Sequence, residues 1–134
     1  MSLDAQLNDS VKNVPECMAA GYVDVSTGML LGVKTVDSHP GEVLDLLAAA
    51  TADLFQGSNV VAIEDIFKKA RGTNDANAHY FQEIVVLSEN LVHVFIRGKT
   101  YTDHIMTFVC RKSVNLGMAL TKARMEVPKL EASV

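Results

Sequence analysis

Residues 80–111 read YFQEIVVLSENLVHVFIRGKTYTDHIMTFVCR, and they show the architecture of the chain most clearly. Three segments within them, 80–88, 91–97 and 104–111, are rich in β-branched and aromatic residues, which favour strands. Glu89 and Asn90 form a tight turn after the first segment, and residues 98–103 form a looser turn after the second. The sequence therefore predicts three strands in an antiparallel meander.

Two further strands are predicted on the N-terminal side of this meander. Residues 18–25 and 29–36 are small, β-branched or apolar, and Ser26, Thr27 and Gly28 separate them. A glycine adopts positive φ without a steric penalty, as short hairpin loops often require. We expect the two segments to form a β-hairpin.

Helices are predicted where apolar residues recur every three or four positions. The strongest pattern covers residues 43–55, after a helix-start signal in residues 37–40, and Gly57 ends or kinks this helix. Residues 60–70 repeat the period, with Glu64 and Lys68 placed to form an i,i+4 ion pair. A short helix ends before Pro15, and a last helix is capped by Ser113 and stopped by Pro128.

This order of elements predicts an α+β fold, with a five-stranded antiparallel sheet and helices packed on it. The chain has 134 residues, a length that suits one hydrophobic core. We expect residues 1–13 to form a short helix or tail, residues 14–130 to form the single domain, and residues 131–134 to form a tail.

Composition argues against several classes of partner and location. The net charge of −4 offers no basic patch for a phosphate backbone, so nucleic acid is not expected as a partner. Apolar runs fall short of the roughly 20 residues of a membrane helix, so membrane insertion is not expected either. The N-terminus lacks a secretory pattern, and Cys17 and Cys110 form no CxxC motif. These features favour a cytoplasmic protein with free thiols.

Residues that could carry catalysis or bind metal do not occur in a productive pattern. Gly98, Lys99 and Thr100 resemble the end of a P-loop, but His93 stands where that motif needs a glycine. A hairpin turn with a positive-φ glycine is the alternative interpretation. Asp103 and His104 are neighbours in a strand and point to opposite faces, so they cannot share a proton. No histidine pair has metal-ligand spacing, and no GxSxG elbow is present. We predict no enzyme, no cofactor and no metal.

A set of turns and elements resembles the Roadblock/dynein light-chain domain family. The resemblance covers residues 13–127 and rests on Val14-Pro15 before the first strand, the Thr27-Gly28 turn, the helix 43–55, and the motif Ser113-Val114-Asn115-Leu116-Gly117. It implies a sheet with helices on one face and a homodimer or heterodimer. It also implies a role in regulating or scaffolding small GTPases and motor or polarity complexes. Residues 59–78 depart from the family pattern, which usually has a short link there.

Self-association is expected through the segment 80–88, the first strand of the meander. This strand should have an open edge, and Glu83 is its only charge, whereas monomers normally protect such edges with lysines, prolines or bulges. The resemblance implies that the helix 43–55 packs beside the paired strands. The predicted dimer interface consists of Tyr80, Gln82, Ile84, Val85, Val86, Leu87, Leu47 and Leu54.

The leading hypothesis is a non-enzymatic dimeric adaptor or regulator that binds a partner protein, with a small Ras-like GTPase as the partner class. The alternative is a small-molecule sensor of profilin-like architecture. Its signature would be small residues facing a cavity, for which Ala19, Ala20, Gly21 and Gly32 are candidates.

Overall fold

The computed structural model describes residues 2–36, 41–72 and 79–134, without the side chains of residues 41–46. The helix-start signal predicted at 37–40 lies outside these residues. The strands are β1 (Cys17–Asp24), β2 (Met29–Thr35), β3 (Glu83–Leu87), β4 (Leu91–Arg97) and β5 (His104–Arg111). The helices are α1 (Leu3–Asn13), α2 (Gly41–Gln56), α3 (Ser58–Arg71) and α4 (Leu116–Glu131). This order is the predicted one.

The five strands of the described residues form one antiparallel sheet in the order β2-β1-β5-β4-β3. The β1–β2 hairpin turns at Gly28, whose φ of 72° confirms the predicted glycine turn. β1 then pairs with β5, which places Cys17 opposite Cys110, both free and buried. Within the described chain β2 and β3 are the edges of the sheet, so the predicted edge position of β3 is confirmed.

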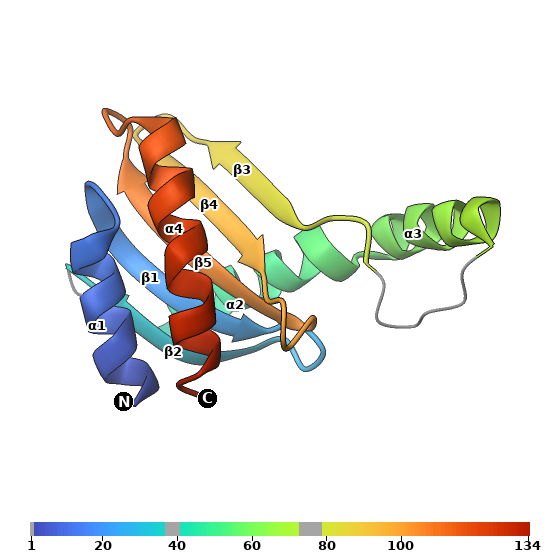
Figure 1. The fold of residues 1–134 in the computed structure, drawn as a ribbon, viewed down its shortest axis with the longest axis horizontal. Helices are drawn as coiled ribbons and strands as arrows, with labels where there is room; N and C mark the ends of the chain where they lie inside the picture. The colour runs from blue at the N-terminus through green and yellow to red at the C-terminus, as the bar shows by residue number, and fades with distance from the viewer. Residues whose placement is uncertain (1, 37–40, 73–78) are drawn as a thin grey trace.

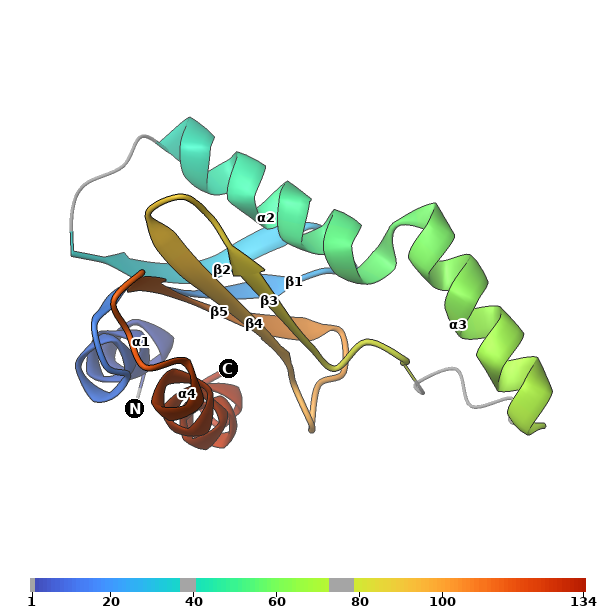
Figure 2. The same cartoon turned by 90° about the horizontal axis from the view of Figure 1, so that it is seen from above.

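Both faces of the sheet are covered by helices (Figure 1, Figure 2). On β4, Val92, Val94 and Ile96 face a core beneath α1 and α4, while His93 and Phe95 face the side of α2. The expectation of helices on one face alone is therefore wrong. Because β4 and its neighbours carry apolar residues on both sides, burial of either side needs a helix.

α1 and α4 are joined by a buried carboxylate. Glu126 is 2% exposed and accepts hydrogen bonds from Ser10 at 2.8 Å, Asn13 at 3.3 Å and Lys129 at 3.0 Å. Burial by itself raises the pKa of Glu126, but these donors outweigh it and hold the pKa below its usual value. The charge thereby fixes the N-terminal helix on the C-terminal one.

The ends of α4 differ from the prediction. Asn115 is the N-cap, accepting the Met118 N–H at 3.0 Å, whereas Ser113 donates to Glu16. Pro128 lies inside the helix and does not stop it. Continuing the helix buries Leu130 and Glu131, which offsets the backbone hydrogen bond that proline cannot make. Glu131, predicted to begin a tail, is helical and 4% exposed.

The loop between β4 and β5 closes around Glu131. Its carboxylate accepts the backbone N–H groups of Lys99 at 3.0 Å, Thr100 at 2.8 Å and Tyr101 at 2.7 Å. Gly98 is not among the positive-φ glycines of the described chain, so that part of the prediction is wrong. A side chain is excluded there because a Cβ would stand 2.5 Å from the Tyr101 carbonyl oxygen. Residues 99–101, directly after Gly98, thus bind an anion of their own chain.

In the described parts of the chain, no helix combines the length and apolar character needed to cross a membrane.

Candidate interaction surface at the β3 edge

The backbone pairing of β3 with β4 determines which amides face the open edge. The Arg97 N–H donates to the Gln82 carbonyl at 2.8 Å, and the Ser88 N–H donates to the Leu91 carbonyl at 2.9 Å. The register between these two points is regular, and hydrogen-bonded pairs alternate along an antiparallel ladder. Even-numbered residues of the strand therefore bond to β4.

The odd-numbered residues of β3 point their N–H and C=O groups away from β4. These residues are Glu83, Val85 and Leu87. Of the two valines considered as dimer contacts, Val85 presents its amide to the edge, whereas the Val86 amide is used within the sheet. An additional strand would thus bond to Val85.

The side chains of β3 do not protect this edge. Val85 and Val86 are each 37% exposed and Leu87 is 68% exposed, whereas Ile84 packs against the core beneath α2. The only charge of the strand is engaged elsewhere, because Arg124 on α4 donates two 2.7 Å hydrogen bonds to Glu83. These bonds lower the pKa of Glu83.

The start of the strand differs from the prediction, since Tyr80 and Gln82 precede β3. The Tyr80 N–H donates to Glu64 at 2.6 Å, and its ring stacks on Phe67 at 4.4 Å between centroids. Gln82 donates through its side chain to the His79 carbonyl. Tyr80 is therefore held by α3 and does not pair with β4.

One flank of α2 adds a second apolar surface. Leu47 and Leu54 are 51% and 37% exposed and lie two turns apart, hence on the same side of the helix. Ala48, Thr51 and Phe55 lie on the buried side. The two leucines predicted for the interface thus form an exposed stripe beside the sheet-facing side of α2.

A groove of about 300 Å³ lies between α2 and the sheet, and Leu47 opens onto it. Its wall includes residues of β1 and β2, Leu91 and His93 of β4, and Thr107 and Val109 of β5. Most of the wall comes from β1 and β2, so the groove lies mainly between α2 and that hairpin and reaches β4 at Leu91 and His93.

Small residues give this groove its space. Ala19, Ala20 and Gly21 line it, as expected for the small-molecule alternative. Gly32 does not, because a Cβ there would meet Leu7 and Leu3 of α1, on the opposite face of the sheet.

His93 is the titratable group among the described residues of the groove wall. It is half-buried, its Nε2 lies 3.3 Å from the Ser88 hydroxyl, and its ring stacks beside Phe95. Burial lowers the pKa of His93. His93 thus faces the side of the sheet opposite to Val92 and Val94.

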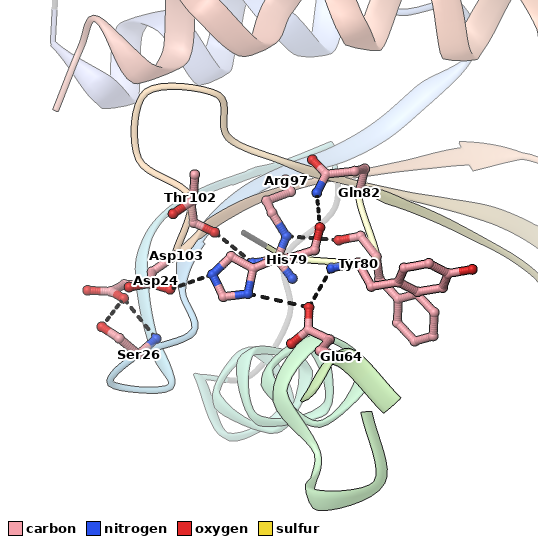
Figure 3. A network of polar contacts seen from close by, with 10 residues as sticks. Asp24, Ser26, Glu64, His79, Tyr80, Gln82, Arg97, Thr102 and Asp103 are labelled. Carbon is pink, nitrogen blue, oxygen red and sulfur yellow. Dashed lines mark hydrogen bonds and ion pairs between the residues drawn. The ribbon is translucent and has the colours of Figure 1, made fainter. Parts of the chain in front are cut away.

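A polar network ties α3 to the segment before β3 (Figure 3). Glu64 is 5% exposed, and His79 lies between Glu64 at 3.4 Å and Asp103 at 3.6 Å. Arg97, 1% exposed, donates to the carbonyls of Phe81 at 2.8 Å and Thr102 at 2.7 Å. The network therefore fixes α3, the β3 approach and the β4–β5 loop relative to one another.

Sequence reasoning missed this network because its members lie on separate elements. Glu64 was expected to pair with Lys68, but its carboxylate turns to the 79–80 segment, 15 residues or more along the chain. A buried carboxylate among the charged residues of an amphipathic helix carries no local sequence signal.

Asp103 and His104, the candidate pair of the sequence, do not bond to each other. His104 contacts the Tyr22 hydroxyl at 2.6 Å, and Asp103 contacts His79, so the two neighbours have different partners. Within the described residues no three histidine, cysteine or acidic side chains gather as a metal site.

Comparison with solved structures identifies the fold. No protein-family model matches the sequence, and no curated protein matches it significantly. A Roadblock/LC7 domain from Streptomyces avermitilis superposes with a TM-score of 0.65 at 13% identity, covering 98% of this chain and 97% of that one. The chain has the Roadblock/LC7 fold. The resemblance and the fold class predicted from the sequence are thus confirmed.

Two other structures share this Roadblock/LC7 architecture. The gliding protein MglB from Thermus thermophilus gives a TM-score of 0.68 at 19% identity, covering 96% of this chain and 85% of that one. MglB in a tetrameric arrangement gives 0.67 at 20% identity, with coverages of 97% and 88%.

Proposed function

We propose that this Roadblock/LC7 chain is a dimeric adaptor that recognises a partner protein and performs no chemistry of its own. The observation that carries the proposal is the β3 edge, with the Val85 amide free to bond and Leu87 68% exposed. An edge without lysine, proline or bulge pairs readily with another strand. A two-fold axis beside Val85 lets the β3 edges of two copies bond to each other, so one kind of surface forms the whole interface.

The flank of α2 supports the same arrangement. Two-fold pairing of β3 makes one continuous sheet, whose α2 face includes the groove beside Leu47 in each copy. A second α2 approaching across the axis would cover Leu47 and Leu54, which are exposed in the single chain. The eight residues predicted for the interface remain its proposed members. Ile84 would contribute by its packing in the core beneath α2, and Gln82 by its exposed side chain.

The partner class that we propose is a small Ras-like GTPase. The fold, shared with MglB and with a Roadblock/LC7 domain, supports it. So does the family resemblance, which implies regulation or scaffolding of such proteins. A regulator must distinguish nucleotide states, because the switch segments of a GTPase order around the γ-phosphate.

Affinity purification from the native cells, with GDP or a non-hydrolysable GTP analogue added, tests the partner class. We expect a small GTPase to be recovered with one nucleotide and not with the other. Equal recovery with both nucleotides would support a scaffold and contradict a regulatory role. Recovery of no GTPase would contradict the proposed partner class.

A second candidate function is a small-molecule sensor, which the groove favours. Its volume of about 300 Å³ and its small lining residues would admit a compact apolar ligand. A ligand that binds only the folded chain raises the unfolding temperature by mass action. A thermal-shift screen of apolar fragments on the Val85→Pro variant, whose groove a partner would no longer cover, separates this function from self-association.

A further inference from the structure

Helix α3 carries an apolar stripe that its own chain leaves exposed. Ile63 is 39% exposed, Ile66 66% and Phe67 40%. Their spacing places them on one flank of the helix together with Val60 and Ala70. The opposite flank is mainly polar and includes Ser58, Asp65, Lys68 and Lys69, with Val61 as an exposed apolar residue among them. An apolar stripe of this kind normally packs against another apolar surface.

The position of α3 is fixed even though this stripe is open. Gly57 separates α3 from α2, and a Cβ at Gly57 would stand 2.6 Å from the Asp53 carbonyl oxygen, so the bend needs glycine. Glu64 and Phe67 then hold α3 against the 79–80 segment. α3 projects beyond the end of the sheet at which β3 begins (Figure 1, Figure 2).

We propose that the α3 stripe packs against a second copy of this chain, at the turn between β3 and β4 of that copy. This inference rests on the proposed dimer. Antiparallel pairing of two β3 strands places the start of one beside the end of the other. The start of β3 adjoins α3 through Tyr80 and Phe67, and the end of β3 carries Leu87 and the exposed turn residues Glu89 and Asn90.

Interface size and charge support this occupant. A stable interface takes roughly 800 Å² from each side, which an edge of five residues does not supply alone. Leu87 is exposed at the end of that edge, and the α3 stripe is exposed beside its start, where Phe67 stacks on Tyr80. Arg71 follows Ala70 of the stripe at the end of α3, and the turn it would meet carries the acidic Glu89.

A pair of matched variants on the two flanks of α3 tests the proposal. Ile66→Lys and Asp65→Asn each raise the net charge by one unit, the first by adding a cation on the apolar stripe and the second by removing an anion from the opposite flank. Both side chains are exposed, so neither change should unfold the chain. By sedimentation equilibrium we expect Ile66→Lys to raise the dimer Kd by about ten-fold or more, and Asp65→Asn by less than about two-fold.

The outcomes separate the two proposals. An Ile66→Lys variant that dimerises like the wild type would overturn the proposed contact of α3 with the second copy and leave β3 pairing intact. The same result is expected if α3 instead binds a different protein. A monomeric wild type would overturn both proposals.

A cross-link locates the contact directly. Chains with Ala70→Cys and chains with Asn90→Cys, mixed and treated with a short bismaleimide, should give a covalent dimer that neither variant gives alone. The native thiols are 8% and 0% exposed, so they should stay unreacted. Absence of the mixed dimer, with sedimentation still showing association, would contradict the proposal.

Discussion

Glu131 shows how a single side chain can hold a loop and a chain end together. Its carboxylate accepts three consecutive N–H groups from residues 99–101, and the residue is 4% exposed. Glu131→Ala leaves those donors without an acceptor, so we expect the free energy of unfolding to fall by about 2–3 kcal/mol. Urea denaturation measures the loss.

Asp53→Ala is the matched control for this variant, because Asp53 is an exposed acidic residue on α2. It should change the stability by less than about 0.5 kcal/mol. A Glu131→Ala protein as stable as the control would show that the loop does not depend on this carboxylate.

His93 predicts a dependence of stability on pH. Burial lowers its pKa in the folded chain below the ordinary value of 6.5. Above pH 6.5 the His93 ring is neutral in both the folded and the unfolded chain, so it contributes no pH dependence of stability. As the pH falls below 6.5, the unfolded chain binds the proton first, so folding stability decreases until the folded pKa is reached.

The measurement is urea denaturation at about pH 7.5 and about pH 5.5 for the wild type and for His93→Gln. We expect the wild type to lose more stability over this interval than the variant, which keeps every other titrating group. Equal losses would mean that burial does not hold the His93 ring neutral.

For strands and helices, the sequence predicted which elements occur better than it predicted where each one begins and ends. The limits of β4 and β5 agree with the prediction to the residue, because turns with clear composition enclose both strands. β3 begins three residues later than predicted, since Tyr80 contacts α3, an interaction between distant residues. Pro128 was expected to end α4, and only the burial of Leu130 and Glu131 explains why it does not.

The attachment of α3 gives a prediction for this helix alone. Glu64 is its buried anchor, and Glu64→Ala removes the acceptor of the Tyr80 N–H without reducing helix propensity. A lost charge-assisted hydrogen bond of about 1.5–3 kcal/mol corresponds to roughly ten- to hundred-fold easier local opening. Hydrogen exchange should therefore accelerate by that factor in residues 58–71 and stay unchanged in α4.

Asp65→Ala serves as the control, because it changes a neighbouring acidic residue on the exposed flank. Should α3 exchange equally in both variants, Glu64 would not be its anchor.

For the molecule as a whole, strand count, sheet class and the edge position of β3 could be predicted from patterns of alternation and turns. The covering of both faces could not, because the family resemblance implied one covered face and sequence periodicity does not say which side a helix occupies. Of the candidate surface, Val85, Val86, Leu87, Leu47 and Leu54 are exposed as the interface hypothesis requires. The Glu64 and Arg97 network and the α3 stripe depend on tertiary placement, which no short motif encodes.

Self-association through β3 is tested by sedimentation equilibrium of the wild type, Val85→Pro and Val86→Pro at tens of micromolar. We predict a wild-type mass of twice the 14.5 kDa chain and a folded Val85→Pro at the mass of one chain, because proline removes the amide that faces the open edge. Val86→Pro should instead destabilise the single chain, since its amide bonds to β4. A wild type that sediments as a monomer, or a Val85→Pro variant that associates as the wild type does, would contradict the account.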